Sequence, residues 1–206
     1  MKVLLVNGSP NVAGCTYTAL SEVAKELNKA GIESEIFHIG DAPIAGCNAC
    51  GMCRQIGKCV FDDSVNVCLE KVKECDGFIV GSPVYYASAN GALTAFLDRL
   101  FFSGGKNFYL KAAAAVASAR RAGTTATLDQ LNKYFLISQM TVIGSQYWNM
   151  VHGSTPDDVR EDMEGMQIMR TLGRNMAYFL KCRAAADAAG VALPEREDVV
   201  RTNFIR

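Results

Sequence analysis

The chain has 206 residues, half of them apolar, and its 21 basic residues balance 21 acidic ones. This length and composition suit one α/β domain with a sizeable buried core, so we expect a single domain over residues 1–206. Binding to a nucleic-acid backbone is favoured when cationic side chains displace counterions from the phosphates, and this chain has no excess of such side chains. That balance argues against nucleic acid as a partner.

Membrane insertion and secretion are also not expected. The apolar run at residues 3–6 is far shorter than the core of a secretory signal peptide. The uncharged stretch 77–97 approaches the length of a membrane span, but Pro83, Asn90 and Gly91 interrupt it. Eight cysteines in such a chain favour a reducing, cytoplasmic location, where clustered cysteines serve metal or redox chemistry.

Short apolar runs alternate along the chain with segments of helical periodicity. The predicted strands are 2–6, 33–39, 77–81, 112–117 and 140–143. The predicted helices are 16–30, 65–75, 90–102, 124–136 and 156–189, the last as one helix or two. We expect a cysteine-rich insertion loop at about 42–63 and an irregular C-terminal tail at 190–206.

This alternation predicts a parallel sheet with helices on both faces, joined by right-handed crossovers. Five strands fit a flavodoxin-like three-layer α/β sandwich with the strand order 2-1-3-4-5. In that order a ligand binds where the first and third strands meet, at the carboxyl end of the sheet.

The loop at residues 7–16 joins the first strand to the first helix, whose N-terminal N–H groups favour an anion. The hydroxyls of Ser9 and Thr16 add donors. Gly8 and Gly14 are too far apart for the dinucleotide pattern, and no Walker sequence occurs, so the loop favours a mononucleotide phosphate. The alternative is an ordinary turn with Thr16 near the helix cap.

Two further loops follow the third and fourth strands. In the first, Tyr85 and Tyr86 are placed to line a flat ring, unless they are core anchors. In the second, Arg120 and Arg121 stand at a helix start, where the helix dipole disfavours cations. They are therefore candidates for holding an anionic group, the alternative being a solvated turn.

Cys47, Cys50, Cys53 and Cys59 form the pattern C-x2-C-x2-C-x5-C. Such spacing gathers thiolates around one point, as in ferredoxin runs, although the fourth ligand is spaced differently here. Two interpretations remain open, namely that the cysteines hold a four-iron cluster or that they bind no metal. Zinc is favoured less, because structural zinc sites usually separate two cysteine pairs by a longer loop. We expect the four cysteines to lie together beside the ligand edge of the sheet.

Three segments, GSPNVAGCT, GCNACGMCRQIGKCVFDD and GSPVYYASANGALTAFLDR, occur in this order. Together they resemble the NADPH-dependent FMN reductase and iron–sulfur flavoprotein families over residues 1–150. The resemblance implies FMN, NAD(P)H as co-substrate and a 4Fe-4S cluster on the four cysteines. It implies FMN contacts from Ser9, Asn11, Cys15, Thr16, Pro83, Val84, Tyr85, Tyr86, Ser88, Ser118, Arg120 and Gly123. Cys15 departs from the family, which often has Asn or Asp there, and a thiol donates more weakly.

The sequence therefore predicts an FMN-dependent oxidoreductase that passes electrons from NAD(P)H to a flavin, a quinone, another small molecule or a redox protein. No side chain is assigned as a catalytic acid or base. The alternatives are a flavodoxin-type electron carrier, which tends to be more acidic, and a thiol redox sensor.

We also expect a homo-oligomer, a dimer or a tetramer, with FMN near the interface. The apolar surface for it is predicted from Leu97, Leu100, Phe101, Phe102 and residues 147–151. Asp98 and Arg99 are expected on a solvated helix face or at the subunit interface.

Overall fold

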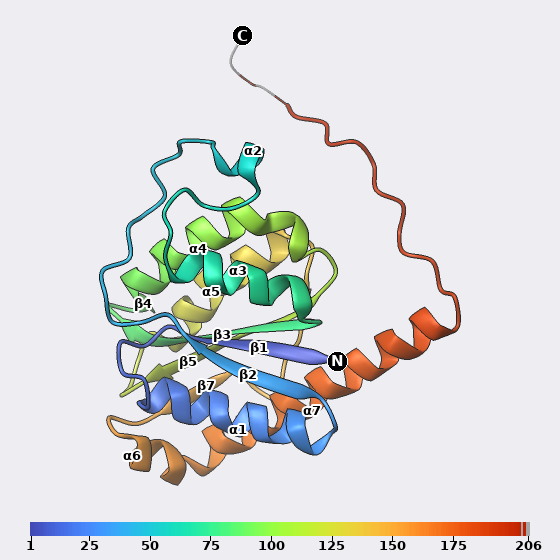
Figure 1. The fold of residues 1–206 in the computed structure, drawn as a ribbon. Helices are drawn as coiled ribbons and strands as arrows, with labels where there is room; N and C mark the ends of the chain where they lie inside the picture. The colour runs from blue at the N-terminus through green and yellow to red at the C-terminus, as the bar shows by residue number, and fades with distance from the viewer. Residues whose placement is uncertain (203, 205–206) are drawn as a thin grey trace.

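A computed structural model describes residues 1–202 and 204 (Figure 1). Its parallel sheet has the order β2-β1-β3-β5-β6. These strands are β1 (Lys2–Asn7), β2 (Glu33–His38), β3 (Gly77–Tyr85), β5 (Ala112–Ala119) and β6 (Thr141–Val142). A short strand, β4 (Ser88–Ala89), pairs antiparallel with the end of β3. With this hairpin set aside, the order is the predicted 2-1-3-4-5, and the flavodoxin-like fold is confirmed.

Helices cover both faces of the sheet, as Figure 1 shows. One face carries α1 (Cys15–Lys29), α6 (Pro156–Glu161) and α7 (Met163–Ala188). The other carries α3 (Ser64–Glu74), α4 (Gly91–Gly104) and α5 (Thr124–Ile137). A four-residue helix, α2 (Cys53–Ile56), lies in the cysteine-rich loop, and a 3-10 turn, η1 (Gly105–Asn107), follows α4. Over the described residues, no helix is both long and apolar enough to cross a membrane.

The two cores follow from the two-residue period of the strands. In β1, Val3 and Leu5 pack toward α1 and α7, whereas Leu4 and Val6 pack toward α3 and α4. All eight residues of β5 are buried, and six of them are alanine. Side chains this small let the covering helices approach the centre of the sheet, which explains how a run of alanines serves as a core strand.

The last strand of the sheet is divided, which differs from the single strand predicted at 140–143. β6 pairs with the start of β5, at Ala112 and Ala113. A second segment, β7 (Met150–His152), pairs with the end of β5 and is also parallel to it. The intervening residues leave the sheet and return, so β7 brings the loop that follows it to the ligand edge.

The C-terminal helical region is two helices rather than one. Pro156 begins α6, and the preceding Thr155 forms a capping box with Asp158. The backbone N–H groups of Ser154 and Thr155 hold the pKa of the Asp158 carboxyl below its usual value. Asp162 ends α6 and caps α7 by accepting a hydrogen bond from the Gly165 N–H group.

Two expectations about α4 are wrong. Leu97, Leu100 and Phe101 are buried in the core between α4, α3 and the sheet, so they offer no surface to a partner. Arg99, expected on a solvated face or at an interface, is 1% exposed, because its guanidinium turns into the cysteine-rich loop. Asp98 is exposed as expected, and Phe102 remains 52% exposed.

Candidate functional site

The loop that follows β1 is shaped by Asn7, a buried residue at the end of the strand. Its amide nitrogen donates to the Val12 carbonyl at 3.3 Å, and its Oδ1 accepts from the Ser9 N–H at 3.1 Å. The Ser9 hydroxyl oxygen accepts in turn from the Asn11 N–H at 3.1 Å. The loop is therefore fixed by its own side chains before any ligand binds.

The start of α1 is open toward this loop. Gly14 stands at the N-cap, and within the described chain no side chain caps the helix. The first turn also contains no acidic residue. Its backbone N–H groups, with the partial positive charge of the helix end, are suited to an anionic group such as a phosphate.

The first and third loops are joined through buried hydroxyls. Thr16 Oγ1 lies 2.8 Å from Ser118 Oγ at the end of β5, and both residues are nearly inaccessible to solvent. The Cys15 thiol donates to the Gly153 carbonyl across 3.8 Å, and burial raises the pKa of this thiol. Cys15 is thus a neutral thiol occupied with the segment after β7.

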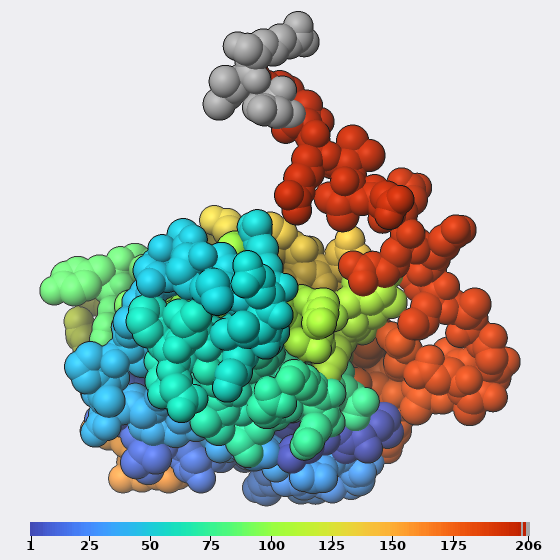
Figure 2. All heavy atoms as spheres, turned by 45° about the horizontal axis from the view of Figure 1, so that its top comes forward, coloured from blue at the N-terminus to red at the C-terminus, as the bar shows by residue number. Residues whose placement is uncertain are grey.

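A tight hairpin between β3 and β4 forms the second loop. Val84 pairs with Ala89, and Tyr85 pairs with Ser88. The two residues between them, Tyr86 and Ala87, have φ angles of 50° and 57°. Two-residue hairpin turns with both residues left-handed normally use Asn and Gly, so this turn carries strain. The tip of the hairpin projects from one side of the molecule (Figure 2). Tyr86, within this tip, is fully exposed.

Neighbouring residues hold this hairpin against the other two loops. Gln130 of α5 accepts hydrogen bonds from the Ser88 hydroxyl at 2.6 Å and the Ala89 N–H at 2.9 Å. Gly123 has φ +91° and lies so close that a Cβ atom there would come within 2.6 Å of Ala87 Cα. Asn90 donates from its side-chain amide to the Gly8 carbonyl at 2.9 Å. The three loops therefore form one connected edge.

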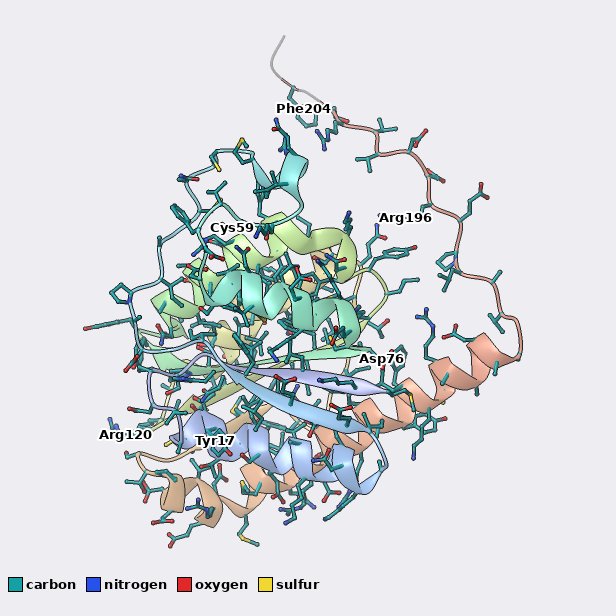
Figure 3. All side chains as sticks on the ribbon, viewed as in Figure 1. Tyr17, Cys59, Asp76, Arg120, Arg196 and Phe204 are labelled. Atoms are coloured by element: carbon teal, nitrogen blue, oxygen red, sulfur yellow. The ribbon has the colours of Figure 1, made fainter. Side chains whose placement is uncertain are left out.

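The predicted FMN contacts divide by exposure along this edge. Ser9, Thr16 and Ser118 are buried; Cys15, Pro83, Val84, Ser88 and Gly123 are half-buried; Asn11, Tyr85, Tyr86 and Arg120 are exposed. Figure 3 shows Arg120 at the end of the sheet opposite Asp76, where the strands reach their carboxyl ends. The structure thus brings all the predicted loops together at the β1–β3 switch point.

Sequence reasoning missed the residues that shape the edge: Asn7, His38, Asn90 and Gln130. The His38 ring nitrogen Nε2 lies 2.7 Å from the Ser9 carbonyl and so ties the end of β2 to the loop. Asn90 was detectable, because an Asn directly before a helix is a common N-cap, and it does cap α4. The other three carried no signal, since their partners are distant in sequence or lie in an irregular loop.

The four cysteines Cys47, Cys50, Cys53 and Cys59 line one small cavity. It lies against α4, near Arg99 and Ser103. The expectation that the cysteines lie beside the ligand edge is therefore wrong. From the start of α4 to Arg99, eight residues rise roughly 12 Å along the helix. Figure 3 accordingly places Cys59 over the α3 and α4 layer, well apart from Arg120.

The chemistry of this cavity suits a thiolate-ligated metal centre. Phe61 and Phe102 contribute apolar walls, and the buried Arg99, which is paired with Asp63, directs its Nε–H at Cys59 Sγ. In the described part of the chain, no group of three or more Cys, His, Asp or Glu residues is placed to hold a metal ion. A cluster would therefore require the cysteine-rich loop to bring the four thiols closer together than they lie in this structure.

A larger cavity of about 770 Å³ adjoins the cysteine-rich loop at Cys47 and Ala49. Its other walls come from α4, α5 and the C-terminal tail, with the aromatic side chains Phe101, Phe102, Tyr109 and Tyr134. The tail reaches it through Arg196, whose guanidinium lies 4.3 Å from the centre of the Tyr109 ring. This size and aromatic lining are typical of sites for small organic molecules.

The strand order and the anion-ready loop at the β1–β3 switch point define the class of flavodoxin-like nucleotide-binding proteins. Comparison with known families is more specific: the model of the NADPH-dependent FMN reductase family matches residues 1–155. The chain therefore belongs to the NADPH-dependent FMN reductase family. The enzyme class expected from the sequence is confirmed by this membership.

Similar curated proteins share most of the chain. An iron–sulfur flavoprotein of Methanocaldococcus jannaschii is 33% identical over 189 residues, covering 88% of this chain and 98% of its own. An iron–sulfur flavoprotein of Methanosarcina thermophila is 33% identical over 188 residues, covering 88% and 96%. Among solved structures, an NAD(P)H:acceptor oxidoreductase of Paracoccus denitrificans has a TM-score of 0.64 at 15% identity, covering 88% and 97%. That structure shares the fold.

Proposed function

We propose that this protein binds FMN at the three-loop edge and uses it to transfer electrons from NAD(P)H to an acceptor. The observation that carries this proposal is the preformed loop after β1, which leads into the uncapped N-terminus of α1. An open helix start at the switch point of a doubly wound sheet suits one phosphate group. Family membership supports the identity of the nucleotide.

Each loop has a separate role in this proposal. Backbone N–H groups of Val12, Ala13, Cys15 and Thr16, with the Ser9 hydroxyl, bind the phosphate. Pro83, Val84, Tyr85, Tyr86 and Ser88 lie along the flavin, and Ser118, Arg120 and Gly123 close its far side. When bound, FMN supplies the ability to accept a hydride and to release electrons singly or in pairs. The protein positions the ring and limits the access of water to it.

The cysteine cavity is proposed to hold a 4Fe-4S cluster. Four thiols at ferredoxin-like spacing line one cavity, and a buried guanidinium donates a hydrogen bond to one of them, Cys59. The curated relatives that share most of this chain are named iron–sulfur flavoproteins. Cys47, Cys50, Cys53 and Cys59 are the proposed ligands, and the cluster exchanges single electrons.

The acceptor is proposed to be a small molecule or a redox protein that reaches the cysteine side of α4. The aromatic cavity of about 770 Å³ adjoins that side at Cys47. Lys106 and Arg196 outnumber Asp98, the acidic residue in its wall, and favour an anionic partner such as a sulfonated quinone. We further propose a cytoplasmic, homo-oligomeric protein of one domain, with neither nucleic acid nor membrane as a partner.

The test is the steady-state oxidation of NADH and NADPH by protein purified without oxygen and loaded with FMN. With a flavin or quinone acceptor, we expect saturable oxidation that depends on enzyme and FMN. A visible absorption spectrum of the same sample reports flavin bands and a broad iron–sulfur shoulder. Bound FMN without any oxidation of NAD(P)H would instead support an electron carrier.

A further inference from the structure

Arg99 is a buried cation whose guanidinium faces the cysteine-rich loop. Its side chain has no exposed area. Nη1 donates to Asp63 Oδ2 at 2.6 Å and to the Ala45 carbonyl at 3.3 Å. Nη2 donates to Asp63 Oδ1 at 2.9 Å and to the Phe61 carbonyl at 3.4 Å. The remaining donor, Nε, is directed at Cys59 Sγ across 3.2 Å. Every N–H group of the guanidinium therefore has an acceptor.

These bonds attach both ends of the cysteine-rich loop to α4. Ala45 precedes the first cysteine of the pattern, whereas Phe61 and Asp63 follow the last. Asp63 also caps α3, where its Oδ1 accepts from the Val65 N–H at 3.1 Å. The guanidinium carbon of Arg99 lies over the Phe61 ring, 4.8 Å from its centre. Arg99 is thus fixed on all sides, and Cys59 Sγ is held at a defined point.

A donor fixed at this point acts on any metal centre that the sulfur ligates. A cluster held by four thiolates is negatively charged, and reduction adds a further electron. The charge of Arg99 is largely offset by its ion pair with Asp63, so its direct action on the cluster is through the Nε hydrogen bond. A hydrogen bond to a ligand sulfur stabilises the reduced form, which raises the reduction potential. The same bond also orients the ligand, as outer partners of metal ligands generally do.

We propose that Arg99 is a positioning residue for the cluster ligand Cys59 and that it raises the reduction potential of the cluster. This inference rests on the proposed 4Fe-4S cluster. It assigns to α4, through one side chain, both the anchoring of the cysteine-rich loop and the tuning of the metal centre.

The test compares wild-type protein with Arg99→Gln, Arg99→Lys and the control Arg170→Gln, all reconstituted anaerobically. Arg99→Lys keeps a positive charge but cannot reproduce the five-donor fork. Arg170→Gln removes an arginine of α7 whose Nη1 lies 3.0 Å from Glu22, remote from the cysteines. The readouts are FMN content, iron and sulfide per chain, the rate of iron loss to a chelator, and the cluster potential from an EPR-monitored titration.

For Arg99→Gln we expect iron loss about ten- to hundredfold faster and a more negative cluster potential, with FMN content unchanged. Arg99→Lys is expected to lie between this variant and the wild type, and Arg170→Gln to match the wild type. If Arg99→Gln fails to fold, as judged by FMN content and circular dichroism, Arg99→Lys decides.

Two negative results have different meanings. Wild-type protein that binds no iron or sulfide overturns the cluster, and the inference about Arg99 with it. A wild-type cluster whose potential and iron loss are the same in folded Arg99 variants overturns the inference alone. The proposed cluster would then stand.

Discussion

Thr16 Oγ1 and Ser118 Oγ lie 2.8 Å apart in a buried contact that joins the first turn of α1 to the end of β5. One hydroxyl donates its proton to the other, and the accepting hydroxyl can donate its own proton to a further group. The contact thereby couples the loop proposed for phosphate to the loop proposed for the far side of the flavin. Removal of either hydroxyl leaves the other without its buried partner.

We predict that Thr16→Ala weakens FMN binding by about 1–3 kcal/mol, because it removes a polar contact beside a charged phosphate. Thr16→Ser retains the hydroxyl and is the matched control, with an expected affinity close to that of the wild type. Titration of apoprotein with FMN, followed by quenching of flavin fluorescence, measures both. An unchanged dissociation constant in Thr16→Ala would remove this residue from the proposed site.

A substitution in the hairpin turn at Tyr86 and Ala87 is expected to stabilise the protein. Ala87 has a φ angle of 57°, a region that glycine occupies without a steric penalty. Ala87→Gly is therefore expected to raise the free energy of unfolding by about 1 kcal/mol. Ala119→Gly, at a buried position in β5, is the control and is expected to destabilise. Thermal unfolding followed by circular dichroism distinguishes the expected stabilisation from the expected destabilisation.

The fold was predictable because its strands are continuous apolar runs whose pairing follows from the alternation with helices. β3 nevertheless continues past the predicted end at Gly81 to Tyr85. Its pairing with β1 ends at Gly81, and Pro83 pairs only with Ser118 of β5. Pro83 lacks an N–H group, but β1 no longer runs beside β3 at this position, so no hydrogen bond of the sheet is lost. A local pattern does not show where a neighbouring strand stops.

The site was predictable to the level of its loops but not of its internal bonds. Glycine, serine and proline clusters after each strand mark loops, and the topology brings those loops to one edge. Arg99 was placed wrongly because its partners Asp63 and Cys59 are 36 and 40 residues away along the chain. They belong to a segment without periodicity, so only the folded structure reveals that an apparently surface arginine is buried.

Glu26 provides a pH-dependent contribution to stability. Its buried carboxylate accepts from Lys29 Nζ at 2.6 Å and from Arg174 Nε at 2.8 Å. Bonding to Lys29 and then to Arg174 lowers the pKa of Glu26, against the opposing effect of burial. Because the folded pKa is below the unfolded value of about 4.3, the stabilisation is present above that value and is lost as pH falls through the folded pKa.

We therefore expect Glu26→Gln to destabilise the protein at pH 7 by about 1–3 kcal/mol and by progressively less below about pH 4. Glu164→Gln, an exposed substitution in the first turn of α7, is the control. Urea unfolding at a series of pH values measures both differences. A gap between wild type and Glu26→Gln that stays constant down to pH 3 would contradict the linkage.

The cysteines can be tested one at a time. Single Cys→Ser changes at Cys47, Cys50, Cys53 and Cys59 are expected to lower iron and sulfide while FMN content stays the same, because the phosphate loop is separate. Cys182→Ser is the control, since Cys182 is an exposed thiol on α7. Iron and acid-labile sulfide assays after anaerobic reconstitution decide, and equal iron in all five variants would rule out these ligands.

The structure limits the surface that is available for the expected homo-oligomer. Leu97, Leu100 and Phe101 lie in the core. Besides Tyr85 and Tyr86 of the proposed flavin site, the exposed aromatic side chains near the ligand edge include Tyr147 and Trp148. Their rings pack edge to face at 4.4 Å, and both residues are slightly more than half exposed. They immediately precede β7, which runs beside the end of β5, so an interface here would lie next to the proposed flavin.

A paired, rigid aromatic surface of this kind is typical of an interface centre, where truncation of one anchor commonly costs about 2 kcal/mol or more. We expect Trp148→Ala to raise the dimer dissociation constant by at least about tenfold, as measured by sedimentation or light scattering over a concentration series. Tyr178→Ala, which removes an aromatic ring that is 72% exposed on α7, is the control and is expected to leave the dimer intact. A strictly monomeric wild type at micromolar concentration would refute the oligomer. An equal effect of the two substitutions would place the interface elsewhere.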